Sequence, residues 1–173
     1  MKKMKKLCAV FCALSSGLFL ASAFAGQNNF VRWERIVGVI TAPNVDNPVG
    51  SIHSGTFPWS AQSGTASVDL TTGAVAFQVN GLVINGASPS GTTGPVTLVK
   101  GTLVCNAGTG SEAVFDTPKT VLNAHGDAQF TGHLGQVSAS CGSPVFLIRI
   151  VSPAGASGLW IATGANPSSL DTL

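Results

Sequence analysis

The chain contains no tyrosine, and only 9% of its residues are Asp, Glu, Lys or Arg, whereas 45% are hydrophobic. A helical domain normally draws on Leu, Glu, Lys and Arg, so the scarcity of charged residues argues against a mainly helical fold. Intrinsic disorder requires low hydrophobicity together with high net charge, and this composition has neither. The composition therefore favours a compact β domain with a neutral surface rich in hydroxyl groups.

Motifs of common catalytic and cofactor sites are also missing. The sequence has no G-x-S-x-G, no H-E-x-x-H, no glycine-rich phosphate loop and no calcium loop of the D-x-D-x-D-G type. Because each of these motifs places reactive groups or ligands at a fixed spacing, its absence removes the sequence basis for that chemistry. We therefore predict that the protein is not an enzyme and uses no cofactor.

Residues 1–25 have the pattern of a secretory signal peptide. Four lysines precede an apolar run from Leu7 to Leu20, and Ala23 and Ala25 stand at the small-residue positions of a cleavage site. The apolar run spans about 14 residues, fewer than the roughly 20 that a membrane span requires. We predict cleavage after Ala25, export to the periplasm, the cell surface or the extracellular space, and no membrane span in the mature protein.

Removal of residues 1–25 changes the charge balance. Four of the nine basic residues lie in this segment, which leaves five against seven acidic residues and a net charge of about −2. The sequence pI of 8.5 describes the whole chain, so it gives no reason to expect nucleic acid as a partner. The remaining residues 26–173 have the length of one domain with its own core.

The chain has four cysteines, and Cys8 and Cys12 lie in the predicted signal peptide. Cys105 and Cys141 are then the only pair in an exported, oxidising environment, so we predict that they form a disulfide. A redox or metal site normally has close C-x-x-C spacing, whereas these two cysteines are 36 positions apart. The spacing therefore favours a structural role.

The most continuous apolar run of the mature chain is Val145–Val151, bracketed by Pro144 and Pro153. The run is short and rich in β-branched residues, which is typical of a strand covered on both faces. A long first strand is predicted over residues 30–40. The apolar residues predicted on one face of that first strand are Val31, Trp33, Val37 and Val39.

The rest of the mature chain shows further short alternating segments separated by Gly- and Pro-rich turns. The clearest are Thr65–Leu70 and Ala74–Asn80, which flank a Thr-Thr-Gly turn and predict a hairpin. In total the pattern predicts an all-β fold of about eight or nine strands, as a jelly-roll-like or immunoglobulin-like antiparallel β-sandwich. A closed β-barrel is the alternative. We expect residues 164–173 to form a loose tail.

Candidate site residues are few. Trp59, beside Pro58 in a predicted loop, is the tryptophan best placed for contact with a ligand such as a sugar. His125, Asp127 and His133 are the one compact set of potential metal ligands. We favour the alternative that residues 125–127 form a turn and that His133 is a partly exposed strand residue. His53 has no predicted partner. Arg149, in the most buried predicted strand, needs a counter-charge, for which the candidates are Glu112, Asp116 and Asp127.

The size of the mature domain, its single predicted disulfide and its bias to Gly, Ala, Thr and Val resemble bacterial pilins of the chaperone–usher type. The position of Cys105 and Cys141 in the second half of the chain and the lack of tyrosine depart from that pattern. The sequence is therefore assigned to no family.

Three hypotheses on function follow. The first is a secreted, non-enzymatic structural or surface protein, including an envelope or appendage subunit that assembles with copies of itself through β-strands. The alternative is a carbohydrate-binding or adhesive β-sandwich module that contacts surface glycans through Trp59. The third is a secreted hydrolase that uses His125, Asp127 or His133.

Overall fold

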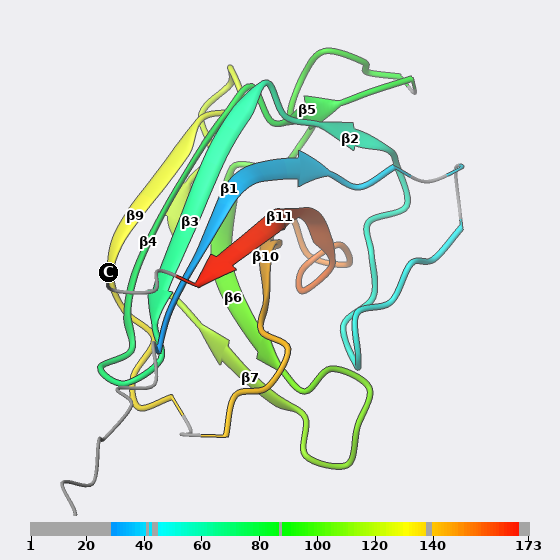
Figure 1. Cartoon of the computed structure of the whole chain (residues 1–173). Coiled ribbons are helices and arrows are strands. Elements are labelled where there is room, and N and C mark those ends of the chain that lie inside the picture. The colour runs from blue at the N-terminus through cyan, green and yellow to red at the C-terminus, as the bar shows by residue number, and fades with distance from the viewer. Residues whose placement is uncertain (1–28, 41, 43–44, 87, 138–139, 170–173) are drawn as a thin grey trace, which may run out of the picture.

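The computed structural model describes residues 29–169 except 41, 43, 44, 87, 138 and 139; the predicted signal peptide lies outside this range. The described residues form eleven β-strands and no helix (Figure 1). The strands are β1 (Phe30–Gly38), β2 (Trp59–Ser60), β3 (Ser63–Asp69), β4 (Ala74–Asn80), β5 (Val83–Ile84), β6 (Leu98–Cys105), β7 (Ala113–Asp116), β8 (Thr120–Val121), β9 (Ala128–His133), β10 (Val145–Ser152) and β11 (Trp160–Ser169). Among these residues there is no helical segment that could span a bilayer.

Nine strands form one antiparallel sheet in the order β7-β6-β10-β11-β1-β3-β4-β9, with β8 pairing β6 next to β7. The sheet curls into a half-barrel around the core, and β2 and β5 form a separate two-stranded ribbon near one end (Figure 1). The prediction of an antiparallel all-β fold with one disulfide is confirmed. The structure has two or three strands more than predicted, and β2, β5 and β8 have only two residues each.

Strand β10 is buried on both faces, as predicted from its continuous apolar sequence. Phe146, Leu147 and Ile148 are consecutive and fully buried. They can be buried together because β10 lies between β6 and β11, with core packing on both sides of the sheet. Strand β10 therefore provides the centre of the core.

Strand β1 is held within its own chain, between β11 and β3. Its buried face differs from the prediction, because Ile36 is buried whereas Val37 is only half-buried. Glu34 and Arg35 are both exposed, so the alternation shifts by one residue between them. The shift lies opposite Asn166 of β11, whose φ of 53° is in the left-handed region and interrupts regular pleating.

Strand β11 corrects the prediction of a loose tail from residue 164. It runs from Trp160 to Ser169, and residues 162–169 pair with β1. Gly, Asn and Pro in this segment weaken its β-propensity, which is why the sequence favoured a tail. Pairing with the apolar strand β1 overrides that local preference. Residues 170–173 lie outside the described range.

An aromatic cluster ties the strands together inside the curled sheet. The ring centroid of Phe146 lies 5.6 Å from that of Trp33 and 5.6 Å from that of Phe77. Two glycines make room for these rings: a Cβ on Gly101 would lie 2.8 Å from Phe146, and one on Gly164 would lie 2.4 Å from Trp33. The packing of the rings from β1, β4 and β10 therefore requires glycine, which has no side chain, at these positions in β6 and β11.

Candidate functional site

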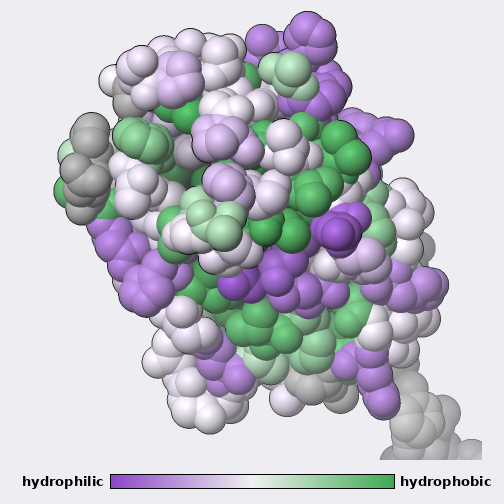
Figure 2. Space-filling model, turned by 180° about the vertical axis from the view of Figure 1, so that it is seen from behind, coloured by the Kyte–Doolittle hydropathy of each residue, from purple (hydrophilic) through white to green (hydrophobic). Residues whose placement is uncertain are grey.

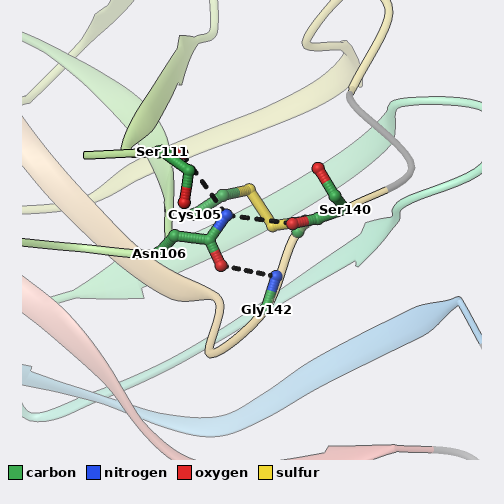
Figure 3. The surroundings of a disulfide bond; sticks show 6 residues. Cys105, Asn106, Ser111, Ser140 and Gly142 are labelled. Carbon is green, nitrogen blue, oxygen red and sulfur yellow. Dashed lines mark hydrogen bonds between the residues drawn. A yellow bond between two sulfur atoms is a disulfide. The ribbon is translucent and has the colours of Figure 1, made fainter. Parts of the chain in front are cut away.

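The predicted disulfide joins Cys105, at the end of β6, to Cys141 (Figure 3). The adjacent Asn106 side chain donates to the Ser140 carbonyl at 2.9 Å and accepts from the Gly142 N–H at 3.0 Å. The same amide reaches the Ser111 carbonyl at 3.4 Å. Asn106 therefore fastens the segments on both sides of the bridge, and the surroundings of the disulfide are those of a structural cross-link.

His125, Asp127 and His133 do not come together. Asp127 precedes β9 and His133 ends it, so the two residues lie at opposite ends of the strand. The Asp127 carboxylate accepts hydrogen bonds from the Gly81 N–H and the Asn123 side chain, and these bonds lower the pKa of Asp127. In residues 29–169 as described, no group of three or more His, Cys, Asp or Glu is placed to hold a metal.

The sequence predicted a loop at Trp59, and this prediction is wrong. Trp59 lies in β2, where it pairs with Ile84 of β5. It is only 4% exposed, so it cannot offer a flat surface for stacking. Its ring instead lines a small pocket of about 120 Å³, here called the apolar pocket. The large side chains of the apolar pocket are Phe57, Trp59, Ile84, Val96, Ile150 and Leu159.

Arg149 pairs with Asp116, one of its three predicted partners, at 3.3 Å. Lys100 lies directly across from Arg149 on the neighbouring strand and also pairs with Asp116, at 2.5 Å. Thr102 donates a further hydrogen bond to the same carboxylate. Burial raises the pKa of Asp116, but the hydrogen bonds from Lys100 and Thr102 and the two positive charges outweigh it, so the pKa lies below its ordinary value.

Asp116→Asn should therefore lower the free energy of unfolding at pH 7 by about 1–2 kcal/mol, because Lys100 and Arg149 lose the negative charge that they share. The effect is smaller than for a fully buried pair because 36% of the Asp116 side chain is exposed. A group with a depressed pKa stabilises the fold above its unfolded pKa, and this contribution is lost as the pH falls through the folded value. Urea unfolding at pH 7 and at a series of acidic pH values measures both effects.

The control is Glu34→Gln, which removes an exposed ion pair with Arg32 and should change stability by less than about 0.5 kcal/mol. In acid, the difference between Asp116→Asn and the unmodified protein should shrink. A constant difference from pH 7 to acid would contradict the assigned role of Asp116.

The structure gives His53 a partner that the sequence did not indicate. His53 Nδ1 lies 2.6 Å from Asp46 Oδ2, and the Ser54 N–H donates to Asp46 Oδ1 at 2.9 Å. The hydrogen bond with His53 is the main reason that the pKa of Asp46 is lowered. The Ser54 hydroxyl bonds Asp46 and the Gly55 carbonyl rather than the imidazole, so the group lacks the serine–histidine contact of a hydrolase.

The outer surface of β3, β4 and β9 carries a group of uncharged polar side chains, here called the polar face. Two neighbouring hollows, of about 300 and 400 Å³, cross it and share Gln78 and Gln129. Figure 1 places the three strands side by side on one side of the sheet. The polar face consists of Thr65, Ser67, Gln78, Gln129 and Thr131.

The strand register arranges the polar face in rows. Thr65 lies opposite Gln78, which lies opposite Gln129, so these three residues form a row across three strands. None of the five side chains of the polar face forms a hydrogen bond with any described residue. Their donors and acceptors are therefore free for a ligand.

Strand alternation in the sequence identifies Thr65, Ser67 and Gln78 as outward-facing. Gln129 and Thr131 join them only because β9 pairs with β4 in the structure. Charge is sparse around the polar face, where Arg32 is paired with Glu34 at 3.1 Å. Seen from behind the view of Figure 1, the surface of the molecule intersperses hydrophilic residues with hydrophobic and near-neutral ones (Figure 2). The polar face is thus suited to a neutral ligand.

Comparison of the chain with family models, with curated proteins and with solved structures gave no match in any of the three.

Proposed function

We propose that this protein is an exported, non-enzymatic surface protein that binds saccharides through the polar face. The observation that supports this most strongly is the set of five adjacent, uncharged polar side chains without intramolecular partners. Sugar hydroxyls both donate and accept hydrogen bonds, and the carboxamides of Gln78 and Gln129 offer both functions side by side. The hollows also lie within the size range of ligand sites.

Phe30 adds an apolar element to this proposal. It lines one end of the hollow that contains Ser67 and Thr131, and it is half-buried, so part of its ring is open to solvent. An aromatic ring of this kind packs against the apolar face of a sugar. In this account Phe30 takes the stacking role that the sequence suggested for Trp59.

Binding without hydrolysis is favoured by the carboxylates around the polar face. Glycoside hydrolysis normally needs two carboxyl groups on either side of the scissile bond. Asp127 is the single carboxylate among the described residues that line the two hollows, and it is held by Gly81 and Asn123. A second, appropriately placed acid is absent from that lining.

A glycan array tests the proposal. We expect the mature protein to bind at least one class of neutral oligosaccharide, and Gln78→Leu with Gln129→Leu to weaken this binding at least tenfold, because each lost hydrogen bond contributes roughly 1 kcal/mol. Gln136→Leu is the matched control, since Gln136 is exposed and lies outside the polar face. Failure to bind any glycan, or full binding by the double variant, would refute the proposal.

A further inference from the structure

The apolar pocket is formed where three segments meet at one end of the sheet. The segment before β2 is tied to β11 by a hydrogen bond from the Gly55 N–H to the Trp160 carbonyl at 2.7 Å. The Asn85 N–H, after β5, donates to the Pro58 carbonyl at 2.9 Å. In the β10–β11 connection, the Gly158 N–H donates to the Ile150 carbonyl at 2.7 Å. The walls are therefore fixed by backbone bonds, so the hollow is a built feature of the fold.

Three prolines, Pro89, Pro95 and Pro153, also line the apolar pocket and restrict the backbone of its rim. Several lining residues are exposed, among them Thr56, Phe57 at 42% and Pro89, so the apolar pocket is open to solvent. A ligand can thus enter without a change in the fold.

The indole N–H of Trp59, a buried residue of the pocket wall, has no partner among the described residues. Trp59 is 4% exposed, yet its indole N–H donates no hydrogen bond to any described residue. Among the described residues, every side-chain nitrogen or oxygen that is fully shielded from solvent has a hydrogen-bond partner. Because the Trp59 N–H has none, it must be in contact with solvent. It lies near Gly55, where a Cβ would be 3.7 Å from Trp59 Nε1, and Gly55 also lines the apolar pocket.

A buried indole N–H normally has an acceptor. Trp160 shows the normal case, because its Nε1 donates to the Asn47 carbonyl at 2.8 Å. The wall is mainly apolar, and besides the hydroxyl of the exposed Thr56 the free N–H of Trp59 is a side-chain donor without a partner there. A small number of polar groups in a hydrophobic lining is typical of ligand pockets.

We propose that the apolar pocket binds a small, neutral molecule with one apolar ring and one hydrogen-bond acceptor, which accepts from Trp59 Nε1. The volume of about 120 Å³ sets the size, since a cavity of roughly 150 Å³ in another protein takes benzene. A saccharide does not fit this lining, because its hydroxyls would lose water without finding partners. The site is separate from the polar face and does not depend on the function proposed for that face.

Cyclohexanone is the probe, and cyclohexane, which has a similar ring without an acceptor, is its matched comparison. Binding is followed by NMR on the indole N–H resonances, with the Trp59 signal assigned by its loss in Trp59→Phe. We expect cyclohexanone to shift the Trp59 signal and to bind about fivefold more tightly than cyclohexane. In Trp59→Phe, the two probes should bind equally.

A second variant keeps the test valid if Trp59→Phe disturbs packing. Ala156→Leu places a larger side chain in the apolar pocket and should abolish binding of both probes while the Trp160 signal stays in place. The proposal is overturned if cyclohexanone leaves the Trp59 signal unchanged, or if Ala156→Leu binds both probes as the unmodified protein does.

Discussion

Deletion of residues 30–38 is expected to abolish cooperative folding. The deletion removes β1, which lies between β11 and β3, so both neighbours lose their hydrogen-bond partner. It also removes Trp33, which is 1% exposed and packs on Phe146. Loss of one large buried aromatic side chain typically costs about 3–5 kcal/mol, and the whole domain is expected to have only about 5–15 kcal/mol of stability.

Circular dichroism during heating measures this effect, with Arg32→Ala as a control that changes an exposed side chain of the same strand. The control should keep a sharp transition, whereas the deletion should show none. If the deleted protein kept its melting temperature and lost only the ability to form oligomers, β1 would belong to assembly between copies rather than to its own sheet.

The second large effect is expected from Cys105→Ala with Cys141→Ala. The disulfide closes a loop with a sequence separation of 36, and the chain-entropy treatment assigns roughly 3–4 kcal/mol to a cross-link of that length. For a domain of this size, that loss lowers the melting temperature by about 10 °C. Calorimetry of the double variant and of the unmodified protein gives the difference directly.

Reduction of the unmodified protein provides the matched control for the cysteine variant. Reduction keeps both sulfur atoms. The double variant removes both, including the sulfur of the fully buried Cys105. Both should lose similar stability if the cross-link is the cause. An unchanged melting temperature after complete reduction would show that Asn106 and the surrounding packing hold the two segments without the disulfide.

The parts of the fold that the sequence predicted correctly depend on local pattern. The continuous apolar run of β10 and the alternation of β3 and β4 need no knowledge of distant residues. The errors arise where a distant strand decides the outcome. In β1, Ile36 rather than Val37 is buried, because Asn166 of the distant strand β11 interrupts the regular pairing. Strand β11 continues past residue 164 because β1 pairs with it there.

The candidate sites show the same division. The pairing of Arg149 with Asp116 was among the predicted options because a buried charge requires a counter-charge. Burial of Trp59 was missed because it depends on β5, and the pair of His53 and Asp46 was missed because loop geometry gives no periodic signal. The polar face needs β9 beside β4, a pairing between distant segments that alternation alone does not specify.

Binding of a saccharide to the polar face should be visible at the side-chain amide resonances of Gln78 and Gln129. Two-dimensional NMR can follow both NH₂ groups during titration with the oligosaccharide that gives the strongest array signal. We expect these two amides to shift with a common dissociation constant while the resonance of the indole N–H of Trp59, in the apolar pocket, stays unchanged. Shifts at the Trp59 N–H without shifts at Gln78 and Gln129 would contradict this proposal.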